Sequence, residues 1–149
     1  MPDSELNKQF RAIQPKFSRA YSVLLSMSGL TMAQFVLISE LAANDAQPMC
    51  MTEISNRLHI TKSAVTSLAD KLEKTKLIKR TPHATDRRFY LLQLLPRGEK
   101  MLHVIQTEMV DILMDNLRSF TVDERKVISS FYQNLDKQLE KIFAAHEKK

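Results

Sequence analysis

Two short amphipathic segments separated by a tight turn constrain the fold of this chain more than any other feature. Residues 52–58 and 62–75 each carry apolar side chains at helical spacing, and only His-Ile-Thr at 59–61 separates them. Thr52 and Thr61 are placed to cap the two N-termini. The apolar stripe of the second helix consists of Val65, Leu68, Ala69 and Leu72. This spacing predicts a helix-turn-helix.

The opposite face of the second predicted helix is polar and basic. It carries Lys62, Ser63, Thr66, Ser67 and Lys71. Small side chains at an N-terminal turn allow a helix to enter a major groove, where hydroxyls reach base edges and the helix end favours a phosphate. Taken alone, such a face is typical of solvated surface, so its interpretation depends on the segment that follows.

That following segment predicts a β-hairpin with a basic tip. The β-prone stretches LIKRT (77–81) and FYLLQLL (89–95) flank PHATDRR, which is typical of a turn. Arg87 and Arg88 would lie near the tip, within reach of a minor groove, whose negative potential attracts arginine. A hairpin directly after a helix-turn-helix predicts a winged helix-turn-helix.

The excess positive charge of the chain lies in this region. Residues 61–88 contain eight Lys or Arg and three Asp or Glu, a net charge of +5, which equals the net charge of the whole 149-residue chain. The rest of the chain is therefore balanced. Because phosphates supply the sequence-independent part of DNA affinity, this distribution favours double-stranded DNA as the partner.

The remaining segments predict helices. Apolar residues recur at three- and four-residue steps through 4–28, from Thr31 to Ala43, and again after Pro96. Pro15 either kinks the first helix or starts it afresh. With only two glycines and five prolines, the chain is expected to be mainly α with a small β-hairpin wing. The wide stripes within 6–24 and 102–142 must be buried, either within the chain or in a dimer.

Several other classes of function find no support in the sequence. There is no nucleophile–base motif, phosphate loop or pair of cleft carboxylates, so no enzyme activity and no cofactor are expected. The four histidines lack metal-ligand spacing, so no metal is expected. No apolar run approaches the ~18 residues that cross a bilayer. A single cysteine, Cys50, excludes an intrachain disulfide, which fits the cytoplasm.

Two stretches resemble the MarR family of bacterial transcriptional regulators: TKSAVTSLADKLEKTKLIKR and DRRFYLLQLLPRG. The residues that match the recognition helix, the Asp-x-Arg of the wing and the closing glycine are Ser63, Val65, Thr66, Asp86, Arg88 and Gly98. The sequence departs from the family pattern at Ser67, where the family often has Arg, at Lys76, where it often has Gly, and at Leu95, where it usually has Thr. Lys76 is therefore expected to adopt a left-handed conformation.

The resemblance implies a homodimer that binds a pseudo-palindromic operator. Residues 1–30 and 97–149 would form a helical dimerisation lobe, and residues 31–96 the winged helix-turn-helix DNA-binding lobe, within a single domain. Two recognition helices about 34 Å apart would enter successive major grooves. Many relatives are repressors that a small aromatic or phenolic effector releases from DNA. Tyr21, Met32 and Phe35 are candidates to border such a pocket.

These observations assign a role to each candidate residue. Thr66 and Ser67 would read base edges, and Lys62, Lys71 and Arg87 would contact the DNA backbone. Arg88 would enter the minor groove, while Asp86 would accept hydrogen bonds from it or from the loop and so shape the wing. Two alternatives stay open: an oxidant-sensing regulator that acts through Cys50, and a winged-helix protein-interaction module without DNA binding.

Overall fold

The computed structural model describes residues 1–45 and 47–146. Along the chain its elements are α1 (Asp3–Met27), α2 (Met32–Ala43), β1 (Met49–Cys50), α3 (Met51–Leu58), α4 (Lys62–Lys74), β2 (Ile78–Pro82), β3 (Tyr90–Leu94), α5 (Pro96–Leu117) and α6 (Val122–His146). The expected fold class, mainly α with a small β-hairpin wing, is confirmed. The third strand, β1, extends the hairpin into a small sheet.

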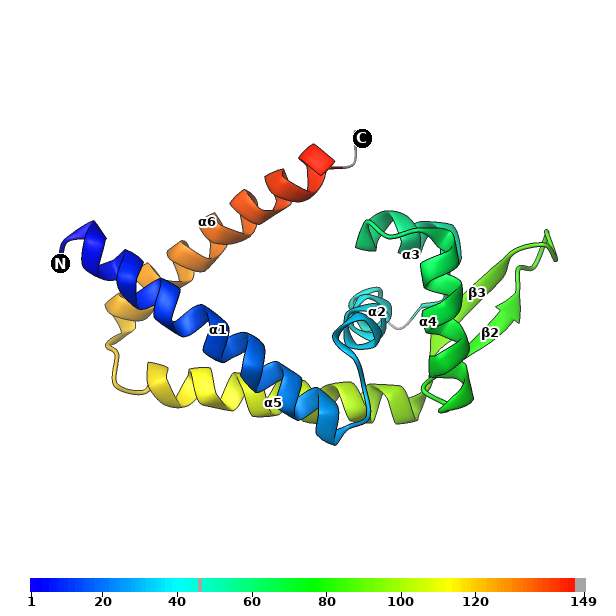
Figure 1. Ribbon diagram of the computed structural model, residues 1–149, viewed down its shortest axis with the longest axis horizontal. Coiled ribbons are helices and arrows are strands. Elements are labelled where there is room, and N and C mark those ends of the chain that lie inside the picture. The colour runs from blue at the N-terminus through cyan, green and yellow to red at the C-terminus, as the bar shows by residue number, and fades with distance from the viewer. Residues whose placement is uncertain (46, 147–149) are drawn as a thin grey trace.

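The molecule is elongated, with two groups of elements at its ends (Figure 1). Helices α1 and α6 lie toward one end, α3, α4 and the β2–β3 hairpin lie at the other, and the long helix α5 runs from the hairpin end to the end where α6 begins. Helix α2 lies between them and carries fully buried side chains at Leu37, Ile38 and Leu41. The hairpin projects away from the helices, so its tip is open to a partner.

The helix-turn-helix is held together by its turn and its apolar interior. His59 ends α3 in the left-handed conformation, with φ of 52°. The buried Ser55 hydroxyl donates to the Ile60 carbonyl at 2.7 Å, and the Ile60 amide donates back to the Ser55 carbonyl at 3.1 Å. Thr61 accepts the Ala64 amide and caps α4, as expected. The angle between α3 and α4 is therefore fixed by backbone and side-chain bonds together.

The sheet is antiparallel with strand order β1-β3-β2. Leu92 pairs with Met49 on one side and with Arg80 on the other, and its side chain is fully buried. Beyond the sheet, the Leu95 amide donates to the Leu77 carbonyl at 2.9 Å. This bond joins the end of the hairpin to the start of α5.

Two sequence expectations need correction or completion. Thr52 does not cap α3: the helix begins at Met51, and Cys50 is its N-cap, with its sulfur accepting the Glu53 amide at 3.4 Å. Helix α1 continues through Pro15, so it does not start afresh there. The expected left-handed conformation of Lys76 is confirmed, with φ of 57°.

Candidate nucleic-acid interface

Helix α4 separates an apolar face from a polar one. Val65, Ala69 and Leu72 are fully buried in the core. The five predicted contact residues, Lys62, Ser63, Thr66, Ser67 and Lys71, are all exposed. They begin at the helix N-terminus, where backbone N–H groups are also free to meet an anion.

The hydroxyls on this face differ in their availability. Thr66 Oγ1 donates to the Lys62 carbonyl at 2.9 Å, which leaves its lone pairs to accept a bond from a base. Ser63 lies 3.2 Å from the Thr61 hydroxyl. The Ser67 hydroxyl forms no hydrogen bond within the residues that the structure describes. The structure thus brings the predicted base-reading hydroxyls onto one accessible surface.

The tip of the wing is organised around Asp86. Its carboxylate accepts three bonds from Arg88: from the backbone N–H at 3.0 Å, from Nε at 3.0 Å and from Nη2 at 2.8 Å. The Arg88 side-chain hydrogen bond, and then its backbone bond, lower the pKa of Asp86. The same carboxylate raises the pKa of Arg88. Arg88 remains 85% exposed along its side chain.

The acidic side chains of residues 61–88 are all paired with arginines of the wing. Asp70 and Glu73 on α4 contact Arg80 on β2, and Asp86 contacts Arg88. The remaining basic residues of this segment form no ion pair within residues 1–45 and 47–146. They are Lys62, Lys71, Lys74, Lys76, Lys79 and Arg87. The positive charge of α4 and the wing is therefore carried by exposed side chains that are open to a polyanion.

Sequence reasoning missed Arg80. Its guanidinium donates to the carbonyl of Thr66 and to the carboxylate of Asp70, which links β2 to the polar flank of α4. A signal was present in the sequence, because Asp70 and Glu73 lie three residues apart and so fall on one side of a helix. A strand arginine that follows two such carboxylates is a candidate partner for both.

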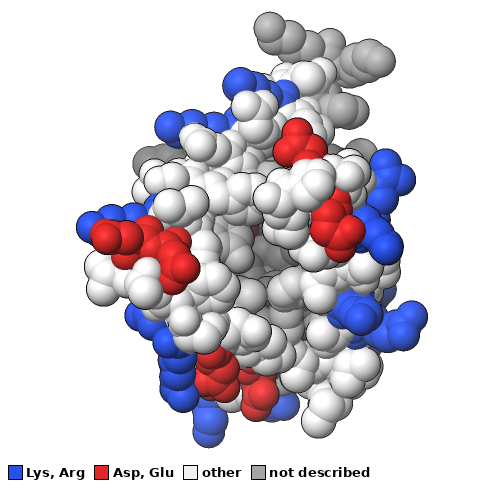
Figure 2. Space-filling view, turned by 90° about the vertical axis from the view of Figure 1, so that its left-hand side faces the viewer, with Lys and Arg blue, Asp and Glu red and all other residues white. Residues whose placement is uncertain are grey.

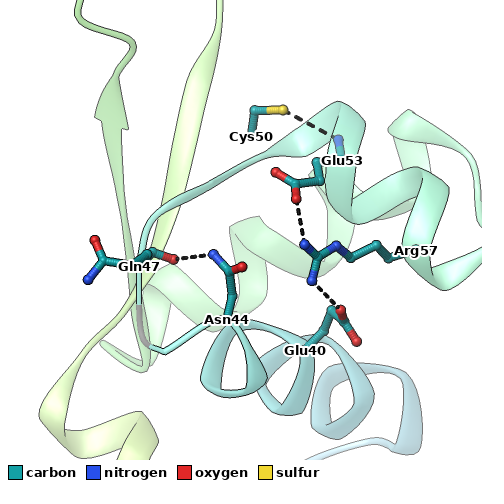
Figure 3. A network of polar contacts seen from close by, with 6 residues as sticks. All are labelled: Glu40, Asn44, Gln47, Cys50, Glu53 and Arg57. Atoms are coloured by element: carbon teal, nitrogen blue, oxygen red, sulfur yellow. Dashed lines mark hydrogen bonds and ion pairs between the residues drawn. The ribbon is translucent and has the colours of Figure 1, made fainter.

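Cys50 belongs to a network that joins α2, β1 and α3 (Figure 3). Apart from the capping bond of Cys50, the network contains Arg57. Its guanidinium lies 2.7 Å from the Glu53 carboxylate and 3.0 Å from the Glu40 carboxylate. The hydrogen bond to Glu40 is the largest cause of a raised pKa for Arg57. The surroundings of Cys50 thus give it a structural role at the start of α3.

The residues proposed for an effector pocket are only partly brought together. The rings of Tyr21 and Phe35 pack with centroids 5.8 Å apart, at the corner between α1 and α2. Met32, at the start of α2, is 43% exposed and is not part of that ring pair. An apolar hollow lies elsewhere, along α1.

That hollow is apolar and open, with a volume of about 810 Å³. Leu6, Phe10 and Ile13 of α1 and Phe131 of α6 line it. Phe10 and Phe131 are 55% and 58% exposed in the single chain. Figure 2 shows uncharged residues around a central hollow at this end of the molecule, with charged side chains mostly around its edge. The predicted apolar stripes are therefore not fully buried within the chain.

Neither a cluster of metal-binding side chains nor a single membrane-spanning helix occurs in the described part of the chain. In the described part of the chain, no group of three or more His, Cys, Asp or Glu side chains could hold a metal ion. No single described helix is long and apolar enough to cross a membrane. The α1–α2 pair meets that test only when taken together across an 86° bend, and α2 is a buried core helix.

The chain is similar to known transcriptional regulators. A model of the MarR family matches residues 28–88, which cover α2 to the wing tip. The uncharacterized HTH-type transcriptional regulator YsmB of Bacillus subtilis is 25% identical over 138 residues, covering 93% of each chain. The HTH-type transcriptional repressor MdtR of Bacillus subtilis is 34% identical over 101 residues, covering 66% of this chain and 61% of its own.

A solved structure shares the fold. The crystal structure of an S. aureus MepR–DNA complex superposes with a TM-score of 0.70 at 22% identity, covering 91% of this chain and 98% of that one. At this identity the likeness shows the fold alone. The relatives named here are transcriptional regulators and not enzymes.

Proposed function

We propose that this chain, which belongs to the MarR family, is a DNA-binding regulator that acts as a homodimer in the cytoplasm and represses transcription by occupying a pseudo-palindromic operator. One observation carries the proposal. The polar face of α4 and the adjoining wing expose the excess positive charge of the chain, while every acidic residue between 61 and 88 is paired with a wing arginine.

On this proposal α4 lies in the major groove. Thr66 and Ser67 face base edges, and Lys62 and Lys71 face phosphates, because their side chains are exposed on one surface that begins at a helix N-terminus. Ser63 lies at the same N-terminal turn, close to the backbone N–H groups that favour a phosphate.

The wing then lies along the adjacent DNA backbone. Arg87 contacts phosphate, and Arg88 reaches the minor groove. Asp86 holds Arg88 through both its backbone and its side chain, so the loop shape is set before DNA arrives. A preformed loop loses less conformational entropy on binding than a disordered one.

The apolar surface of the long helices supports a dimer. In a dimer, residues 1–30 and 97–149, which hold α1, α6 and all of α5 except Pro96, would form the dimerisation lobe, and residues 31–96 the DNA-binding lobe. Phe10 and Phe131 border a hollow of about 810 Å³ that a second copy would fill. Contiguous exposed apolar surface of this kind marks an interaction site.

Regulation by a small aromatic or phenolic effector extends the proposal. The Tyr21–Phe35 ring pair lies where α1 meets α2, at the junction of the two proposed lobes. A ligand that prefers a dimer whose two α4 helices are spaced too differently to fit successive major grooves would lower the DNA-bound population. The named repressor among the relatives, MdtR, supports the sign of regulation.

A selection from random duplexes, followed by binding measurements on the selected sequence, tests the function. We expect a near-palindrome with half-sites about 10 bp apart. Arg88→Ala should weaken binding to all sequences and reduce the salt dependence, whereas Thr66→Ala should relax base preference and leave the salt dependence unchanged. Enrichment of no duplex would favour a protein-interaction module instead.

A further inference from the structure

The proposed function leaves the ion-pair cluster around Arg80 unexplained. This arginine lies on β2, where it pairs with Leu92 of β3, and its side chain is only 22% exposed. Arg88 at the wing tip is 85% exposed. Because the Arg80 side chain is largely buried and contacts other residues of the chain, it is poorly placed to contact DNA.

The contacts of Arg80 all lead to one line of residues on α4. Its Nη2 donates to the Thr66 carbonyl at 3.2 Å and also to Asp70. Its backbone N–H donates to Glu73 Oε1 at 3.2 Å, and Nε lies 3.6 Å from Glu73 Oε2. Positions 66, 70 and 73 follow at steps of four and three, so they form one flank of the helix. That flank borders the face that carries Ser63, Ser67 and Lys71.

The charged groups of this cluster pair with one another within the protein. The carboxylates of Asp70 and Glu73 lie on α4 itself, so they would lie close to the polyanion that the lysines of α4 attract. The buried Nε of Arg80 has no hydrogen-bond partner within the described residues, and it lies 3.6 Å from the Glu73 carboxylate. Arg80 therefore offsets one of the two negative charges of Asp70 and Glu73, and its rigid fork ties α4 to the wing.

We propose that Arg80 is a positioning residue for DNA recognition: it fixes α4 against the β2–β3 wing so that both fit the duplex together, and it does not contact DNA itself. This inference rests on the proposed function. The backbone carbonyl that Arg80 holds belongs to Thr66, a proposed base reader, so a loose cluster would displace that reader directly.

Binding to the selected duplex at several salt concentrations distinguishes positioning from phosphate contact. Arg80→Gln should weaken binding about tenfold relative to Lys79→Gln, which removes the same charge from an exposed neighbouring position in β2. The slope of log affinity against log salt should stay unchanged. A phosphate contact would instead reduce that slope by about 0.9 for each subunit.

Two further variants sharpen the test. Asp70→Asn removes a negative charge beside the DNA, so simple electrostatics predicts tighter binding, whereas positioning predicts a loss similar to that of Arg80→Gln. The double variant should bind DNA at least as tightly as the single variant with the lower affinity, because both changes break the same cluster. Arg80→Lys should not restore binding, since an ammonium cannot reproduce the fork.

Hydrogen exchange without DNA separates failure of this inference from failure of the proposed function. Amides of residues 66–73 and of β2 should exchange faster in Arg80→Gln and Asp70→Asn than in Lys79→Gln. Equal exchange in all three variants, a lower salt slope for Arg80→Gln, or full rescue by Arg80→Lys would overturn the positioning role. A wild-type chain that binds no duplex would overturn the proposed function, and the exchange data would still decide the role of Arg80.

Discussion

Gly98 offers a test of how the wing is joined to the long helices. A Cβ added to Gly98 in the first turn of α5 would lie 2.6 Å from Leu94 Cδ1 and closer still to the Leu77 carbonyl oxygen. Ordinary carbon contacts are about 3.5–4.0 Å. The Leu94 side chain can rotate away, but the Leu77 carbonyl is backbone and accepts the Leu95 amide at 2.9 Å.

The cost of Gly98→Ala follows from these contacts. Overpacking of this kind costs about 1–3 kcal/mol. Displacing the Leu77 carbonyl weakens one hydrogen bond, worth about 1 kcal/mol. The higher helix propensity of alanine returns about 1 kcal/mol. The variant should therefore lower the free energy of unfolding by about 1–3 kcal/mol.

Urea unfolding followed by circular dichroism measures this change. Wild type and variants must be compared at one protein concentration, because the stability of a dimer depends on concentration. Arg97→Ala is the matched control, since Arg97 is the exposed neighbour in the same turn; its stability should change by less than about 0.5 kcal/mol. A Gly98→Ala chain as stable as wild type would show that the α5–wing junction is not as tightly packed as described.

Three further changes test other parts of the account. The side-chain and backbone hydrogen bonds from Arg88 lower the pKa of Asp86, so this contribution to stability is present above the unfolded pKa and is lost as pH falls through the folded pKa. In Arg88→Gln, NMR titration should show the pKa of Asp86 rising toward its ordinary value, and an unmoved pKa would argue against the pairing. Phe10→Asp should give a monomer in sedimentation, whereas a dimer would place the interface elsewhere. Cys50→Ser keeps a capping side chain on α3, so the variant should still bind DNA. Peroxide should leave DNA binding unchanged in both the wild type and the variant. Loss of wild-type binding in peroxide that is absent in Cys50→Ser would favour the oxidant sensor instead.

The winged helix-turn-helix was predictable because its signals are local. Thr61 caps α4, Pro96 starts α5, and the Thr31–Gln34 capping box starts α2, each within a few residues of the signal. The N-cap of α3 was misplaced by two residues, because threonine is a stronger capping residue than cysteine and Thr52 follows Cys50 closely. The start of that helix is set by the end of strand β1 at Cys50 together with the bond from the Glu53 amide to the Cys50 sulfur.

Contacts between distant segments were harder to predict. The Asp86–Arg88 pair spans two residues, so the sequence indicated it directly. Arg80 reaches back 10 residues to Asp70 and 14 to Thr66, and that contact depends on how β2 packs against α4. The choice between intrachain burial and a dimer was open in the sequence, since periodicity does not say what covers an apolar stripe.

The salt dependence of binding to the selected duplex tests the central claim most directly. Lys62, Lys71 and Arg87 expose three charges per subunit at the proposed interface, and Arg88 adds a fourth. If a dimer uses six to eight of them on phosphates, log affinity should fall against log salt with a slope of roughly −5 to −7. A slope near zero, or no binding at low salt, would contradict the assignment of α4 and the wing as a DNA-binding surface.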